Sequence, residues 1–259
     1  MKVVAVIPAR YSSSRFPAKV LFPIAGKPMI QRVWERVRRA KNVNQVVVAT
    51  DDERVIAAVR GFGGDAMLTS PEHRSGTERC AEVAGMIAAD VIINVQGDEP
   101  LIHPESLALV AAPFFDEDQV SMASLMHPLI HYQSYLSSDV VKVVCDDQQN
   151  AIYFSRSPIP FFRDAQPLLE RWERDGTRPP ELRPAPMKHL GVYAYRTNFL
   201  QALVRMPRTE LEEAEMLEQL RVLTWGFRIR MVSTPYDSVG VDVPEDARVV
   251  EAIIREQGE

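Results

Sequence analysis

The chain has 259 residues, of which 46% are hydrophobic and 25% charged, proportions that are ordinary for a soluble protein with a sizeable core. Its net charge of −5 argues against a general nucleic-acid binder, because such proteins present a broad basic surface to the phosphate backbone. No apolar run is long enough for a signal peptide or a membrane span, so we expect a cytoplasmic protein that binds no membrane.

The first predicted element is a strand over Val3 to Ile7, a short apolar and mostly β-branched run. Such a run is typical of a strand buried on both faces of a parallel sheet. Pro8 ends the strand, and the following loop carries Arg10, Arg15 and Lys19 around three consecutive serines. Cations and free backbone N–H groups at the carboxyl end of a buried strand favour polyphosphate binding. The alternative is a solvated basic loop.

The next elements alternate between helix and strand. We expect a helix over 28–40, a strand over 45–50, a helix ending at the glycines 61–64, a strand over 66–68, a helix over 75–89, a strand over 91–95 and a helix over 104–112. Capping boxes that begin at Thr50 and Ser75 mark two of these helix starts. Four repeats of strand and helix predict a parallel sheet with right-handed crossovers.

The second half of the chain changes this rhythm. We expect strands over 119–127, 138–145, 151–155, 188–196 and 228–232, and helices over 198–204, 209–223 and from Pro244 onward. The proline-rich segment 158–186 shows little periodicity beyond a turn or two of helix at 168–174. It is either a mobile surface loop or an ordered lid or interface arm. We therefore predict one α/β domain over 1–259, with a partly antiparallel inserted region over roughly 115–195.

Two aspartates are the candidate metal ligands. Asp98 directly follows a buried strand, after Gly97 permits a sharp turn, and Asp242 lies in a Gly-Val-Asp turn before a helix that starts with proline. Mg²⁺ takes one or two protein carboxylates and completes its coordination with phosphate and water. Each aspartate on its own is better explained as a turn residue or a helix cap than as a metal ligand. Together with the basic loop they favour a Mg²⁺ site beside a triphosphate.

Further candidates are weaker on local grounds. The segment Ser75–Arg79 offers N–H groups and hydroxyls for a base or ribose, although helix capping also explains it. His189 and Tyr193 share one face of a predicted strand. The chain contains no GxxxxGK[ST], GxGxxG, GxSxG or HExxH motif. Cys80 and Cys145 lack metal-site spacing and favour two buried free thiols in a reducing cytoplasm.

Several motifs in this order resemble one family, the 3-deoxy-manno-octulosonate cytidylyltransferases, or CMP-Kdo synthetases. The matching motifs span residues 2–250 and are IPARYSSSRFPAK, NVQGDEP, SGTER, YFSRSPIP, KHLGVYAYR, EMLEQLR and GVDVPED. The resemblance implies a Rossmann-like nucleotidyltransferase fold with a mostly parallel sheet flanked by helices. It also implies a homodimer built largely through the inserted region, and the reaction of CTP with Kdo to give CMP-Kdo and pyrophosphate in lipopolysaccharide assembly.

The resemblance also assigns site residues. The triphosphate-binding and catalytic residues it implies are Arg10, Arg15 and Lys19, with Asp98 and Asp242 as Mg²⁺ ligands. The nucleotide side includes Ser75, Gly76, Thr77, Arg79 and Gln96, and the sugar pocket includes Arg156, His189, Tyr193, Glu218 and Gln219. The family loop often reads PGKP where this chain has Pro17-Ala18-Lys19-Val20, so we expect Ala18 to be confined to φ values that exclude those of glycine.

The residues alone lead to a Mg²⁺-dependent enzyme that acts on a nucleoside triphosphate, and cytidine and Kdo come from the resemblance. We expect the anomeric hydroxyl of Kdo to attack the α-phosphorus of CTP in line. Two alternatives stay open. The acceptor is another acidic sugar, such as a sialic acid or an amino-Kdo, or the chain is a nucleotide-binding regulator without turnover.

Overall fold

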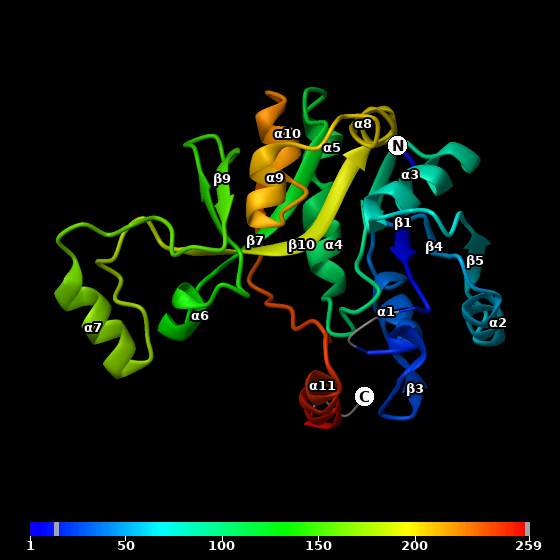
Figure 1. The fold of residues 1–259 in the computed structure, drawn as a ribbon, viewed down its shortest axis with the longest axis horizontal. Helices are drawn as coiled ribbons and strands as arrows, with labels where there is room; N and C mark the ends of the chain where they lie inside the picture. The colour runs from blue at the N-terminus through cyan, green and yellow to red at the C-terminus, as the bar shows by residue number, and fades with distance from the viewer. Residues whose placement is uncertain (13–15, 257–259) are drawn as a thin grey trace.

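The structure is a computed structural model that describes residues 1–12 and 16–256. Its main sheet has the strand order β11-β7-β10-β6-β1-β4-β5, with β8 and β9 attached to β10 (Figure 1). The strands are β1 (Val3–Pro8), β2 (Pro23–Ile24), β3 (Lys27–Pro28), β4 (Gln45–Thr50), β5 (Asp65–Leu68), β6 (Val91–Asn94), β7 (Met122–Pro128), β8 (Lys142–Cys145), β9 (Ala151–Ser155), β10 (Met187–Arg196) and β11 (Arg230–Ser233).

The helices flank this sheet. They are η1 (Lys19–Leu21), α1 (Met29–Val37), α2 (Glu53–Gly61), α3 (Gly76–Met86), α4 (Pro104–Ala111), α5 (Pro113–Asp116), α6 (Tyr132–Leu136), α7 (Gln166–Asp175), α8 (Thr197–Leu203), α9 (Glu210–Glu215), α10 (Leu220–Thr224) and α11 (Pro244–Glu256). Strands β6, β1, β4 and β5 are parallel, whereas β10 is antiparallel to both β6 and β7. The α/β class and the mostly parallel sheet flanked by helices are thus confirmed.

Strand β1 divides the core into two layers. Its odd residues Val3, Ala5 and Ile7 pack into the cluster formed with α1, α2 and α4, and its even residues Val4 and Val6 pack into the cluster that includes α3 and α8. All five side chains are fully buried. A strand covered on both faces needs apolar residues at every position, which explains the uninterrupted run in the sequence.

The proline-rich segment forms an ordered extension in this structure. Figure 1 shows α7 at the opposite end of the molecule from α2. Trp172 of α7 is fully buried against Leu129, Tyr135 and Leu182, and its indole N–H donates to the carbonyl of Ile130 at 2.6 Å. The arrangement agrees with the ordered alternative for this segment, and α7 extends beyond the short helix expected at 168–174.

The helix expected over 209–223 is wrong as a single element. It is interrupted at Met216, whose φ of 54° is left-handed, so that α9 and α10 are separate helices. The predicted start of α9 is confirmed, because the Thr209 side chain caps it. For α2 the capping residue is Asp52 and not Thr50, since Thr50 is buried as the last residue of β4.

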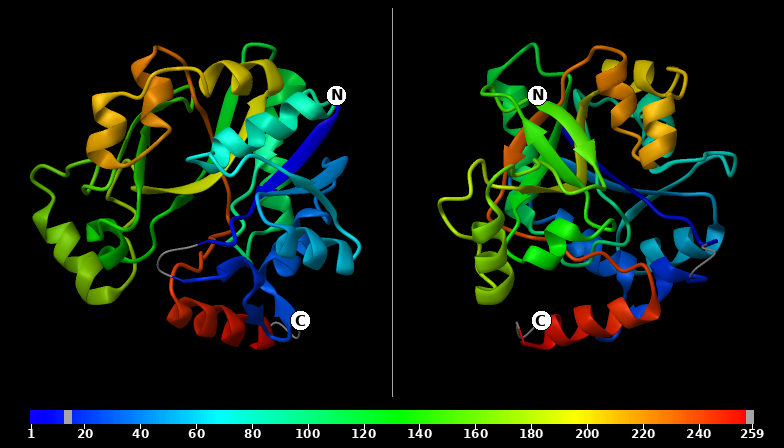
Figure 2. Two further views of the ribbon diagram at one scale, coloured as in Figure 1. Left: turned by 45° about the vertical axis from the view of Figure 1, so that its right-hand side comes forward. Right: turned by 60° about the vertical axis from the view of Figure 1, so that its left-hand side comes forward.

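The C-terminal helix brings a distant segment to the sheet edge. Val241, Ala247, Val250 and Ile254 pack with Phe16 and with the residues that open α1. Figures 1 and 2 show α11 at the bottom of the molecule, at the same end as β3 and away from α9 and α10. Within the described residues, no helix is both long and apolar enough to cross a membrane. Cys80 is buried and Cys145 partly buried, and both are free thiols.

Candidate functional site

The site begins where β1 and β6 end side by side. Gly97 follows β6, and a Cβ atom at this position would lie 2.8 Å from the carbonyl oxygen of Pro8. A Cβ atom on Gly76, at the start of α3, would lie 3.0 Å from the Pro8 ring. Larger side chains at these two glycines would push the strand ends apart. The two glycines therefore allow the loops after β1, β5 and β6 to meet at one edge.

A cavity of about 630 Å³ opens at this edge. It brings together most of the predicted site residues. Those in its lining are Gly76, Thr77, Gln96, Asp98, Arg156, His189, Tyr193, Glu218, Gln219 and Asp242. Residues predicted to bind the nucleotide, the sugar and the metal thus share one cavity, although they come from sequence positions more than 160 residues apart.

The predicted metal pair converges on one cation. The ammonium of Lys19 lies 2.6 Å from Oδ2 of Asp98 and 3.4 Å from Oδ1 of Asp242. The backbone N–H of Val241 donates to the carbonyl of Asp98 at 2.9 Å, which fixes the 240–243 segment over the end of β6. Ala18, just before Lys19, has a φ of 56°. The expectation that alanine excludes this backbone conformation is therefore wrong.

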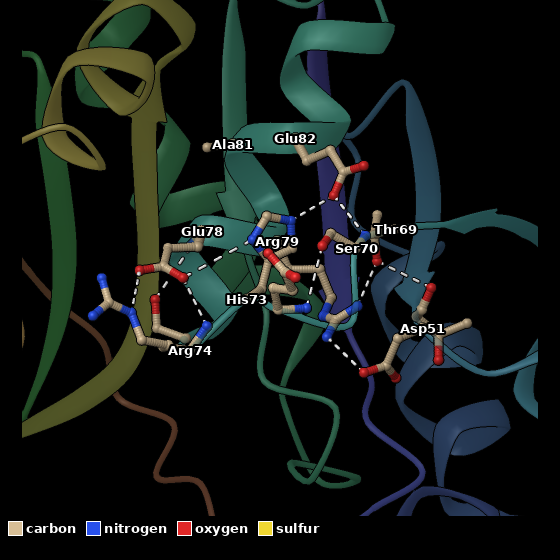
Figure 3. Close-up of polar contacts among 12 residues, drawn as sticks. Asp51, Thr69, Ser70, His73, Arg74, Glu78, Arg79, Ala81 and Glu82 are labelled. Carbon is tan, nitrogen blue, oxygen red and sulfur yellow. Dashed lines mark hydrogen bonds and ion pairs between the residues drawn. The ribbon is translucent and has the colours of Figure 1, made fainter.

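Polar contacts order the loop between β5 and α3 (Figure 3). The carboxylate of Glu82 accepts from the N–H of Ser70 and contacts the His73 ring, so it ties the loop to α3. Arg10, which is exposed, donates to the carbonyl oxygen of His73. Ser75 caps α3 by accepting from the N–H of Glu78 at 3.2 Å. The loop after β1 and the loop before α3 are thereby joined.

Four of the predicted nucleotide residues that the structure describes do not line the cavity, namely Arg10, Lys19, Ser75 and Arg79. Arg79 is fully buried and its guanidinium contacts Thr69 and Asp51 (Figure 3). It therefore connects α3 to the residues that follow β5 and β4. Arg10 and Ser75 lie in the adjoining loops. Arg15 lies outside the described residues. The nucleotide-binding roles of these residues remain predictions.

Arg156, a predicted sugar residue, is held in the cavity wall by several hydrogen bonds. Its Nε donates to the carbonyl of Glu215 at 2.8 Å and its Nη1 donates to the carbonyl of Ser138 at 3.0 Å. The carboxylate of Glu215 accepts from the Arg156 backbone N–H and from the Ser155 hydroxyl. These contacts fix a cation at the cavity wall, and a fixed cation suits an anionic ligand.

His189, Tyr193 and Gln219 form a neutral polar wall. Burial lowers the pKa of His189 to about 3, so its ring is neutral, and Nε2 lies 2.9 Å from the Ser124 hydroxyl. Burial raises the pKa of Tyr193, whose hydroxyl donates to Oε1 of Gln219 at 3.3 Å. The Gln219 amide nitrogen is buried without a hydrogen-bond partner. An unpartnered donor in a cavity wall indicates a place for a ligand oxygen.

Sequence reasoning missed four polar residues beside this wall. Glu99 accepts from the hydroxyl of Ser238, and burial raises its pKa. Lys188 contacts Asp237 at 2.8 Å and the carbonyl of Ser238 at 3.1 Å. The position of Glu99 next to Asp98 could have marked it as a site residue. The contacts of Lys188 with Asp237 and of Glu99 with Ser238 join residues 49 or more positions apart, so the sequence does not show them.

The fold and the site define a nucleotide-binding α/β transferase, because a basic loop, a helix start and two carboxylates meet at the carboxyl ends of parallel strands. A sequence model described as "Cytidylyltransferase" matches residues 4–229. The 3-deoxy-manno-octulosonate cytidylyltransferase of Geobacter metallireducens is 51% identical over 99% of this chain and all of its own. That of Geobacter sulfurreducens is 50% identical over 96% and 98% of the two chains. The chain therefore belongs to the 3-deoxy-manno-octulosonate cytidylyltransferase family.

Solved structures agree with this family. A CMP:2-keto-3-deoxy-manno-octonic acid synthetase in complex with CTP superposes with a TM-score of 0.89. It is 41% identical, and the match covers 99% of this chain and all of that one. A cytidylyltransferase from Leptospira borgpetersenii, with a TM-score of 0.62 and 17% identity over 99% and 87% of the two chains, shares the fold.

Proposed function

We propose that this enzyme transfers the cytidylyl group of CTP to the anomeric hydroxyl of Kdo and releases pyrophosphate. The observation that carries the proposal is the single cavity that joins the nucleotide-side residues Gly76, Thr77 and Gln96 to the sugar-side wall. The family relationship supports CTP as donor and Kdo as acceptor. Neither substrate needs a covalent bond to the protein, because positioning and charge neutralisation supply most of the acceleration in phosphoryl transfer.

On the acceptor side, the wall suits an acidic sugar. We propose that the Arg156 guanidinium faces the carboxylate of Kdo and that the free amide N–H of Gln219 donates to one of its hydroxyls. The neutral ring of His189 adds a polar group without a second charge. A sugar without the carboxylate would leave the Arg156 guanidinium without an anionic partner and should bind more weakly.

On the donor side, we propose that Lys19, Arg10 and Arg15 hold the phosphates that leave as pyrophosphate. Lys19 already lies at the edge of the cavity through its contact with Asp98. The sequence places Arg10 and Arg15 in the same loop. Cations on the leaving group stabilise the charge that develops there during transfer.

The residues present fit a magnesium ion. The carboxylates of Asp98 and Asp242 point toward one position, which the Lys19 ammonium contacts. Among the described residues of the cavity lining, five carry carboxylates and only two are basic, so two anionic substrates need additional cations. We propose that Asp98 and Asp242 hold Mg²⁺, which when bound neutralises phosphate charge and lowers the pKa of the attacking hydroxyl.

We further propose a homodimer formed by the inserted region. Exposed apolar side chains gather in this part of the sequence. Their exposed fractions are 84% for Phe161, 59% for Ile152 and 53% for Ile130. Sedimentation of the wild type and of Phe161→Ser at micromolar concentration tests the interface, since a monomeric wild type contradicts it.

The free cysteines suit a reducing compartment, and we place the reaction in the cytoplasm.

The main test is pyrophosphate release from the purified protein. Each of the four common nucleoside triphosphates is combined with Kdo, a sialic acid, an amino-Kdo or no acceptor, with and without Mg²⁺. We expect release with CTP, Kdo and Mg²⁺. Release with CTP and a different acidic sugar would replace the acceptor and leave the nucleotide site in place. Binding of CTP without release under any condition would favour a nucleotide-binding regulator.

A further inference from the structure

Lys142 is a buried lysine that the proposed chemistry does not use. It lies in β8, and no part of it is exposed to solvent. Its ammonium donates to three backbone carbonyls, those of Ser137 at 2.7 Å, Val140 at 2.6 Å and Arg156 at 2.5 Å. An ammonium group has three N–H donors, so all of them are used.

These three carbonyls come from two separate segments of the cavity wall. Ser137 and Val140 belong to the turn before β8, and Arg156 follows β9. Residues 139–141 and Arg156 all line the cavity. Lys142 therefore lies behind the wall and connects its two segments through one charged group.

The same two segments also meet through the Arg156 side chain. Its Nη1 donates to the carbonyl of Ser138, within the turn that Lys142 binds. The direction of the Arg156 guanidinium thus depends on where this turn lies, and Lys142 fixes the turn relative to the Arg156 backbone. Glu215 on α9 holds Arg156 from the other side.

The three carbonyl oxygens, and not the net charge around it, favour an ammonium group at this position. Burial lowers the pKa of Lys142, while the nearby Glu215 carboxylate raises it and Arg156 lowers it. No neutral side chain of similar length supplies three donors, so Met at this position would leave three carbonyl oxygens without partners. Lysine is thus the residue type that satisfies this arrangement of oxygens.

We infer that Lys142 is a positioning residue for the acceptor sugar, which acts by holding the 137–140 turn and Arg156 in the geometry that receives an acidic sugar. This inference rests on the proposed function. A purely structural lysine would, on substitution, lower stability and affect both substrates alike. A positioning residue changes the acceptor's KM far more than the nucleotide's KM.

The experiment compares Lys142→Met, Lys142→Arg and Lys142→Gln with the wild type in the pyrophosphate-release assay. The matched control is Lys27→Met, which removes a partly exposed ion pair with Glu35 near the start of α1. We expect Lys142→Met to raise KM for Kdo roughly tenfold or more, with KM for CTP changed less than about threefold. Lys142→Arg, which keeps charge and several donors, should recover part of the loss, and Lys27→Met should match the wild type.

Equal changes in both KM values, or no change in either, would overturn the inference. If Lys142→Met does not fold, the Arg and Gln variants decide, because both keep donors: a rise confined to the KM for Kdo that is larger in Gln than in Arg supports it. A rise in both KM values, or none, in these variants rejects it. A wild type without turnover on Kdo would instead reject the proposed function, so the two failures are distinguishable.

Discussion

The ammonium of Lys19 lies 2.6 Å from the Oδ2 atom of Asp98, although 79 residues separate them in sequence. The pair joins the loop after β1 to the end of β6 and also contacts Asp242. One cation of the proposed triphosphate loop thus contacts both proposed metal ligands. Since the proposed substrates bring four or more negative charges, their arrival must redistribute these contacts.

Asp98→Asn should lower kcat by at least about 100-fold, because a principal electrostatic group is lost from the reacting centre. Stability should change by less than about 1 kcal/mol, since the Asp98 side chain is 34% exposed and such pairs contribute little. Steady-state pyrophosphate release and urea unfolding measure the two effects. Asp116→Asn, on the exposed end of α5, is the matched control. Turnover within about tenfold of wild type would remove Asp98 from its proposed role.

Ala18→Gly should raise stability by roughly 0.5–1 kcal/mol. The Cβ atom of alanine is strained at the observed φ of 56°, and this strain outweighs the extra freedom that glycine has in the unfolded chain. Activity should stay near that of the wild type, because the backbone already has the conformation that glycine prefers. Chemical denaturation measures the gain. Ala57→Gly on the exposed side of α2 should have the opposite sign, since glycine lowers helix stability.

The parallel half of the fold was predictable because its signals are local. Buried strands such as β1 are apolar at every position, and capping residues such as Ser75 mark helix starts. The edge that holds Asp98 follows from these elements, because parallel strands end on the same side. The metal pair needed one further assumption, that Asp242 returns to this edge, and the contact between Val241 and Asp98 confirms this return.

The remaining features depend on contacts between distant residues. The residues around Arg79 in the sequence do not show whether its guanidinium is buried in the fold or contacts a nucleotide. Its partner Asp51 lies 28 residues away, after strand β4. Met216 has a left-handed backbone conformation, but no glycine at this position marks it in the sequence. Its neighbour Glu215 instead bonds to the hydroxyl of Ser155, 60 residues away, so tertiary contacts outweigh helix propensity there.

The protein should become less stable as the pH falls, because the buried His189 ring resists protonation in the folded state. Burial lowers its pKa to about 3, whereas the unfolded chain has the ordinary value of 6.5. The unfolded state therefore binds more protons below pH 6.5, so the contribution is fully present above 6.5 and is lost as the pH falls toward 3. The slope between these limits is about 1.4 kcal/mol per pH unit for one proton.

Unfolding by urea at several pH values from 4 to 8 measures this dependence. His189→Gln should remove one proton from the slope below pH 6.5, and His131→Gln, on the exposed segment before α6, should not. An unchanged slope in His189→Gln would show that the ring is already protonated in the folded state. The neutral polar wall proposed for the sugar would then be wrong.

The buried ion pair of Glu212 and Arg221 should stabilise the break between α9 and α10. The Nε atom of Arg221 lies 2.7 Å from Oε2 of Glu212, and each side chain is 8% exposed. The pair joins the two helices on either side of Met216, and the turn between them carries Glu218 and Gln219 into the cavity. Glu212→Gln leaves a buried cation without its partner, which we expect to cost about 3–5 kcal/mol.

Urea unfolding of Glu212→Gln, Arg221→Met and the double variant Glu212→Leu with Arg221→Met measures this pair. The double variant should recover most of the stability, because it leaves no buried charge behind. Its KM for Kdo should nevertheless stay raised, since apolar packing does not fix the turn that presents Gln219. Glu181→Gln, which breaks an exposed pair with Arg171, should cost less than about 1 kcal/mol. A double variant with both wild-type stability and wild-type KM would show that packing alone shapes this part of the sugar pocket.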